Sequence, residues 1–232
     1  MKLAKIEKKV YALAQNWVGE KHVPSIIRGL KKAFKNNIVT FSSERYEGEY
    51  YPYHNVIISG HYCGRISDYI PEHIYIQLSF PKDSRKAIIT EQGAHNLAVK
   101  IIRAIHHEYR HKYQQRQRPL LLQKEYKPKP KQNKLKVMYY GNPDELDAHA
   151  YETQAEKLDI NMLRKAHKIS WKVCEAVYMY RMHFRKQDPK VWQKFLKKVY
   201  KNNEHCNEGN HKSRSNCTTA EKGKGYSCKI KR

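Results

Sequence analysis

Three residues of the segment 101–119 have the types and the spacing to bind a metal ion and activate water. His107, Glu108 and His111 form the pattern H-E-x-x-H. On a helix His107 and His111 lie one turn apart on the same face, so both imidazoles can reach one Zn²⁺ ion. Glu108 is rotated by about 100° and would lie beside the metal, where it could accept a proton from water. The spacing therefore predicts two metal ligands and one general base.

We expect a third ligand in the segment D-E-L-D-A-H-A-Y-E, residues 144–152. Glu145, His149 and Glu152 share one helical face there, and the small Ala148 on that face allows close approach to the H-E-x-x-H helix. We predict that Glu145 completes a site for one Zn²⁺ per chain with an open position for water. Two alternatives stay open, because Glu145 could instead cap its own helix and Glu152 or His149 could be the ligand. His149 could also hold a ligand in place.

The elements around the motif predict an α+β domain. Apolar residues at helical spacing and segments that alternate with period two indicate two N-terminal helices, then three or four strands of one sheet, then mainly helices. The motif would lie on a long helix that ends before Pro119, and Asn142 would cap the helix that carries the third ligand. The expected helices are 1–19, 24–37, 87–117, 142–158, 161–185 and 189–200, and the expected strands are 38–43, 55–63 and 73–81.

The formal net charge of +24 is the outlying feature of the composition. Such a charge attracts polyanions through its summed field and through counterion release. The lysine-rich loop 119–136 and a flexible basic tail at 203–232 are the expected contacts for nucleic acid or another polyanion, with the domain itself at 1–202. An alternative function follows, namely a basic nucleic-acid-binding or virion structural protein whose metal site is structural or inactive.

Cysteine usage and hydropathy give further expectations. Cys63 and Cys174 lie in apolar surroundings and are expected to be buried thiols. Cys206, Cys217 and Cys228 follow one another at equal spacing in the tail and could hold a second metal, although no C-x-x-C pair is present. No window reaches the roughly 18 apolar residues of a membrane span, and the N-terminus lacks the apolar core of a signal peptide. We therefore expect a cytoplasmic protein.

The pattern His107-Glu108-x-x-His111, followed 34 residues later by Glu145-x-x-Ala148-His149, resembles the zinc metallopeptidases called gluzincins. The layout is also similar to small metallopeptidases encoded by bacteriophages, which would make a virion component another expected location. The resemblance covers residues 75 to 155. A zinc-dependent protease resembling SprT would need a third His soon after the motif, and no His occurs between His111 and His149.

The resemblance implies a zincin-like fold and zinc-dependent hydrolysis of peptide bonds. In that fold a small sheet packs on the motif helix, and its edge strand binds an extended protein or peptide substrate. The segment H-I-Y-I-Q-L-S-F-P, residues 73–81, would be that strand. The family also uses a Tyr or His donor over the tetrahedral intermediate, for which Tyr139, Tyr140 and Tyr151 are the candidates. The basic insertion 119–136 and the Cys-bearing tail lie outside the family pattern.

Overall fold

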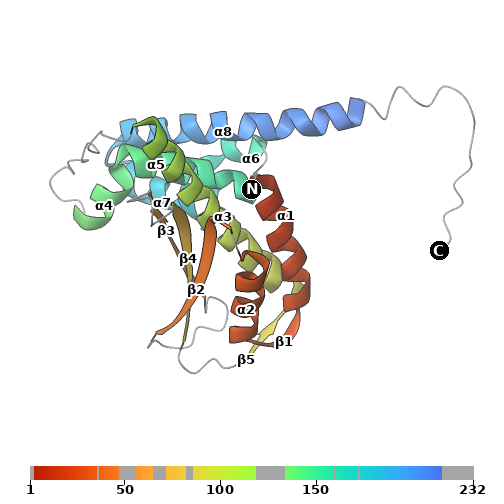
Figure 1. Ribbon diagram of the computed structural model, residues 1–232. Coiled ribbons are helices and arrows are strands. Elements are labelled where there is room, and N and C mark those ends of the chain that lie inside the picture. The colour runs from red at the N-terminus through yellow and green to blue at the C-terminus, as the bar shows by residue number, and fades with distance from the viewer. Residues whose placement is uncertain are drawn as a thin grey trace, which may run out of the picture.

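The structure, a computed structural model, describes residues 3–35, 37–46, 56–64, 72–81, 86–118, 134–158, 160–171 and 173–215. It confirms a mixed α+β architecture in which a small sheet is followed by a helical C-terminal half (Figure 1). The described helices are α1 (Leu3–Ala14), α2 (Val23–Ala33), α3 (Glu91–Gln117), α4 (Lys134–Gly141), α5 (Pro143–Glu152), α6 (Ile160–Arg164), α7 (Glu175–Phe184) and α8 (Pro189–Ser215). Short 3-10 turns occupy Gln15–Trp17, Thr153–Glu156 and Ala166–Lys168.

The main sheet has three strands in the order β2-β4-β3, with bounds β2 (Val39–Tyr46), β3 (Ile57–Cys63) and β4 (His73–Pro81). Strand β4 pairs parallel with β2 and antiparallel with β3. Our expectation that 73–81 is the edge strand is therefore wrong, because β4 is the central strand. Its side chains Ile74, Ile76 and Leu78 are fully buried, and an apolar strand of this kind is stabilised best with neighbours on both edges.

Two short strands were not expected from the sequence. Strands β1 (Gly19–His22) and β5 (Lys86–Ile89) pair antiparallel in a separate two-stranded sheet. Strand β1 begins at Gly19, the last residue of the segment that we assigned to the first helix, and α1 itself ends at Ala14. A strand of four residues is too short to show a clear alternating pattern in the sequence. The pairing of β1 with β5 therefore depends on tertiary contacts.

Two apolar cores lie on either side of the helices that carry the predicted ligands. One core joins α1, α2, the three-stranded sheet and the apolar stripe of α3. The other joins α4 to α8 around the parallel stacked rings of Tyr180 and Phe195, whose centroids are 3.9 Å apart. Helices α3 and α5 pack against each other between these cores. Polar side chains that meet there are sheltered from water by apolar groups on both sides.

Helix α5 begins as the sequence predicted, whereas α3 begins at Glu91 and not at 87, because Lys86–Ile89 form strand β5. The Thr90 side chain accepts a hydrogen bond from the Gly93 amide at the start of α3, and Asn142 accepts one from the Asp144 amide at the start of α5. These caps satisfy amides that have no partner within the helix. Helix α3 ends just before Pro119, which disfavours helical backbone in the preceding residue.

The C-terminal half differs from our expectation in three places. Helix α4 was not expected, and the single helix predicted at 161–185 is divided, since Ile169 is extended and packs into the second core. Helix α8 runs to Ser215, so residues 203–215, which we assigned to a flexible tail, are helical. Asn203 stabilises the helix just past its predicted end at Tyr200, because it is fully buried and donates to the Thr153 hydroxyl and the Val199 carbonyl.

Several predictions concern residues outside the described ranges. Residues 119–133 of the basic insertion and 216–232 of the tail lie outside them, as do the side chains of Cys206, Cys217 and Cys228. Of the two cysteines expected to be buried, Cys174 is buried and Cys63 is only partly covered. No helix in the described part of the chain is long and apolar enough to cross a membrane.

Candidate metal centre

Helix α3 brings the two motif histidines together as the spacing predicted. The Nε2 atoms of His107 and His111 are 3.0 Å apart. His106, the adjacent histidine, lies on the opposite side of the helix, where its Nε2 is 2.8 Å from a Glu7 carboxylate oxygen. The H-E-x-x-H pair therefore converges on one point, while the third histidine of the segment has a separate partner on α1.

The remaining ring nitrogens of both histidines have oxygen partners. The Nδ1 atom of His107 is 3.1 Å from Glu152 Oε2, and the Nδ1 atom of His111 is 2.9 Å from Gln114 Oε1. The Gln114 amide nitrogen donates to the Asp144 carbonyl, which fixes its oxygen toward His111. Each Nδ1 therefore donates a proton, and in the neutral imidazoles each Nε2 is left with a lone pair. Second partners of this kind orient metal-binding histidines.

Glu145 completes this group from helix α5. One carboxylate oxygen lies 3.2 Å from His107 Nε2, and the other lies 3.4 Å from His111 Nε2. Four ligands at about 2.0–2.1 Å from Zn²⁺ are separated by about 3.3 Å at the corners of a tetrahedron. The observed separations of 3.0 to 3.4 Å are close to this edge length, although the two that involve Glu145 end on different oxygens, of which one would be the ligand. These three residues are close enough to hold a metal ion.

The electrostatics of the group favour a positive charge between its members. Burial alone would lower the pKa of His107, but hydrogen bonds with Glu145 and Glu152 raise it to about 10. Burial would conversely raise the pKa of Glu145, yet the two histidines hold it well below its usual range. Two opposed imidazole lone pairs beside a carboxylate repel one another unless a proton or a metal ion lies between them. The donor set therefore fits a divalent cation.

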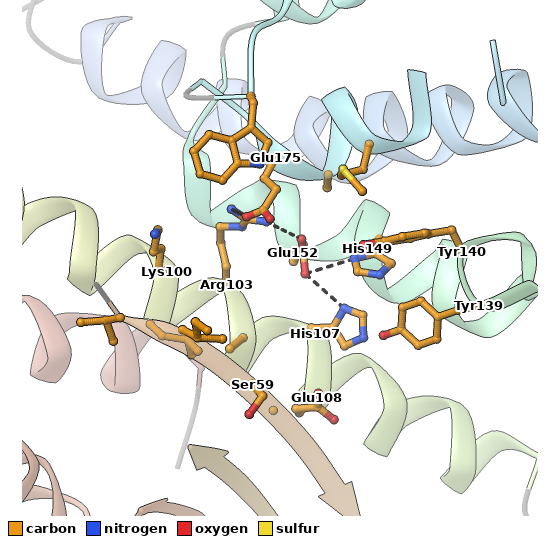
Figure 2. Close-up of a pocket in the computed structure, with 18 residues that line it drawn as sticks. Ser59, Lys100, Arg103, His107, Glu108, Tyr139, Tyr140, His149, Glu152 and Glu175 are labelled. Carbon is orange, nitrogen blue, oxygen red and sulfur yellow. Dashed lines mark hydrogen bonds and ion pairs between the residues drawn. The ribbon is translucent and has the colours of Figure 1, made fainter. Parts of the chain in front are cut away.

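Glu152 and His149 lie behind His107. Glu152 is buried, and its other oxygen accepts a hydrogen bond of 2.8 Å from Arg103 (Figure 2). The His149 ring packs against the His107 ring at 4.5 Å, and its Nδ1 is 3.5 Å from Glu152 Oε2. His107, His149 and Glu152 form a second group that could hold a metal. That group would use His107 Nδ1 and leave the opposed Nε2 atoms unsatisfied, so Glu152 fits better as the partner that orients His107.

Glu108 lies beside the group, on the side of strand β3. Its side chain is 6% exposed, and burial raises the pKa of its carboxyl despite the neighbouring histidines. Gly60 of β3 makes room for it, because a Cβ atom at Gly60 would lie 2.7 Å from both Cγ and Oε1 of Glu108. A buried carboxylate of raised pKa next to the open corner of the ligand group is suited to accept and return a proton.

The three candidate tyrosines lie in different surroundings. The Tyr139 hydroxyl points toward His107 (Figure 2), and burial and a hydrogen bond with Glu145 raise the pKa of the phenol. The Tyr140 ring packs against His149 at 5.1 Å. Tyr151 instead packs near His106, with the Arg110 guanidinium over its ring. Tyr139 is therefore the tyrosine nearest to the ligand group.

A cleft of about 480 Å³ opens on His107 and Glu108. One wall is formed by residues 57–60 of the edge strand β3 and the preceding Val56, and the other walls come mainly from α3, α4, α5 and α7. Within the described residues β3 has a strand partner only on the side of β4.

Three residues of the site were missed by sequence reasoning. Gln114 orients His111, Arg103 holds Glu152, and Gly60 accommodates Glu108. Gln114 could have been found, since it follows His111 by three positions on the same helical face. Arg103 could have been found in the same way, since it precedes His107 by four positions on the same helix. The role of Gly60 depends on the packing of β3 against α3, for which the sequence has no local signal.

Comparison with known proteins adds no assignment, because no family model, curated protein or solved structure matches this chain. We therefore infer the chemistry of the site from the geometry of its own residues.

Proposed function

We propose that this chain is a zinc-dependent metallopeptidase. The observation that carries the proposal is the convergence of His107 Nε2, His111 Nε2 and the Glu145 carboxylate at separations of 3.0 to 3.4 Å. Two imidazoles and one carboxylate with a free fourth position are typical of catalytic zinc rather than structural zinc, which prefers four protein ligands. When bound there, zinc supplies Lewis acidity that lowers the pKa of a coordinated water to about 7.

Residues of the chain would supply the other parts of the reaction. Glu108 accepts the proton of the attacking water and returns it to the leaving amine nitrogen. Tyr139 donates a hydrogen bond to the oxyanion that forms from the scissile carbonyl. Glu152 holds His107 in the tautomer that presents Nε2, and Gln114 does the same for His111. Each assignment uses a contact or a position described above.

The sheet supports the same proposal. Strand β3 lies at the edge of the sheet, runs antiparallel to its neighbour and lines the cleft beside Glu108. An extended peptide could add to its free edge by main-chain hydrogen bonds, with antiparallel pairing favoured. The proposed substrate is accordingly an unfolded protein segment or a peptide. This strand takes the role that we first expected for 73–81 and is consistent with a zincin-like arrangement.

The test compares zinc content and peptide hydrolysis in one set of variants. Glu108→Gln keeps the size of the side chain but cannot accept a proton. It should retain zinc and lose hydrolysis of an unfolded protein substrate by about 10² or more. Glu91→Gln, an exposed change in the first turn of the same helix, is the matched control and should leave both unchanged. Hydrolysis by Glu108→Gln at the wild-type rate would contradict the proposal.

A further inference from the structure

The exposed face of helix α8 carries a row of lysines that the proposed peptidase site does not use. Lys190, Lys194, Lys197 and Lys201 recur at about one per turn and are all exposed. The opposite face of the helix holds Val191, Phe195 and Val199, which are buried in the second core. The amphipathic packing of α8 therefore fixes the lysine row toward solvent over about 17 Å of helix axis.

These lysines are not neutralised by the described part of the chain. Lys198, on the adjacent face, forms an ion pair with Asp147, whereas none of the four row lysines has an ion-pair partner among the described residues. Glu204 is the one acid among the described side chains of α8, and it lies beyond the end of the row. Arg164 of the adjacent α6 adds a further exposed cation near Tyr200, whose hydroxyl donates to the Leu163 carbonyl.

The acids of the chain are largely engaged away from this face. Asp144 pairs with Arg118, and Glu72 pairs with both Lys112 and Arg116. Glu145 and Glu152 lie in the metal centre. The chain has 46 basic and 22 acidic residues. Because these acids form pairs within the fold, the excess of positive charge is left on the surface.

We propose that the lysine row of α8 binds the phosphate backbone of a nucleic acid. Flexible lysines at regular spacing suit phosphates, which carry one charge per about 3.4 Å along each strand of a duplex. A lipid surface is a poorer match, since none of the described side chains of α8, at 189–204, is an exposed large apolar group that could enter it. Figure 1 shows α8 along one side of the molecule, with its C-terminal part extending past the other elements. No residue of α8 is among those that line the cleft, so a long backbone could follow the helix without entering it.

The experiment measures the salt dependence of binding to a mixed-sequence DNA duplex by the full chain. Each lysine–phosphate contact contributes about 0.9 to the slope of log K against log salt. The variant K190Q/K194Q/K197Q/K201Q should reduce the magnitude of that slope by about 3 or more. Between 50 and 200 mM salt, wild type should then lose roughly a hundredfold more affinity than the variant. Unchanged circular dichroism and thermal unfolding would show that the variant folds.

A matched control separates this surface from overall charge. The variant K5Q/K8Q/K31Q/K35Q removes the same charge from exposed positions of α1, of α2 and of the second residue after α2. It should change the slope by less than about 1. Equal effects of the two variants, no DNA binding by wild type at 50 mM salt, or binding to anionic vesicles but not to DNA would each overturn the proposal. None of these results depends on peptide hydrolysis.

Discussion

Replacement of Gly60 by alanine should displace the proposed general base without disturbing the zinc ligands. The added Cβ would lie 2.7 Å from Cγ and Oε1 of Glu108. Ordinary contacts begin at 3.4 Å, so the two groups must separate by about 0.7 Å. The backbone at Gly60 does not lie in the left-handed region, and alanine can adopt it without strain. The side chain of Glu108 is therefore the group expected to move.

The size of the effect follows from that displacement. A misplacement of about 1 Å in a catalytic group can cost about 10² in rate, so Gly60→Ala should lower kcat/KM about 10- to 100-fold. This loss equals about 1.4–2.7 kcal/mol in transition-state stabilisation. The assay is cleavage of an unfolded protein substrate, measured beside the zinc content of the same preparation, which should stay at the wild-type level.

Gly29→Ala is the control for the glycine substitution itself. A Cβ at Gly29, within α2, meets no atom within 4 Å. This change should leave hydrolysis unchanged and stabilise the fold by about 0.5–1 kcal/mol, because alanine loses less backbone entropy in a helix. Wild-type hydrolysis by Gly60→Ala would refute the placement of Glu108 against β3. Loss of zinc by Gly60→Ala would show that the contact supports the ligands and not only the base.

Three more predictions concern the surroundings of the ligands. Glu152→Gln should weaken zinc binding about 10- to 100-fold in a chelator competition, because the carboxylate orients His107. Glu156→Gln, which also removes a partner of Arg103, should have little effect, and equal effects would contradict the assignment. Tyr139→Phe should lower kcat about 10- to 100-fold with zinc content unchanged, whereas Tyr151→Phe should leave kcat unchanged. A loss of kcat in Tyr151→Phe and not in Tyr139→Phe, measured by peptide hydrolysis, would exclude Tyr139 as the donor. Since the pKa of metal-free His107 is raised to about 10, zinc must displace a proton, and apparent zinc affinity should increase by up to about tenfold per pH unit from about pH 6 to 9. An affinity that does not change over that range would show that His107 is already deprotonated or is not a ligand.

The ligand group could be predicted from the sequence because its geometry is local. His107 and His111 are related by one helical turn, and Glu145 follows an Asn-Pro helix start that the sequence marks clearly. Each motif helix has its own cap and apolar stripe, so the residues on its polar face could be predicted before the fold was known. Helix packing then only had to bring the two faces together.

The parts that could not be predicted depend on tertiary neighbours. Strand order depends on pairing across the sheet, and the pattern of 73–81 does not distinguish a central strand from an edge strand. The continuation of α8 past Tyr200 involves Asn203, a polar residue whose buried partner Thr153 is fifty positions away. The separation of Tyr139 from Tyr151 likewise depends on α4, a helix with a weak sequence signal.

Zinc coordination in the purified full chain tests the central claim most directly. X-ray absorption at the zinc edge, with metal content measured on the same sample, reports both the ligand atoms and the stoichiometry. The proposed site predicts one zinc per chain with nitrogen and oxygen ligands at about 2.0–2.1 Å and no sulfur. It also predicts loss of that zinc in His111→Ala and in Glu145→Gln. Retention of zinc in His111→Ala, or sulfur at about 2.3 Å from the cysteine-bearing C-terminal segment, would contradict the account.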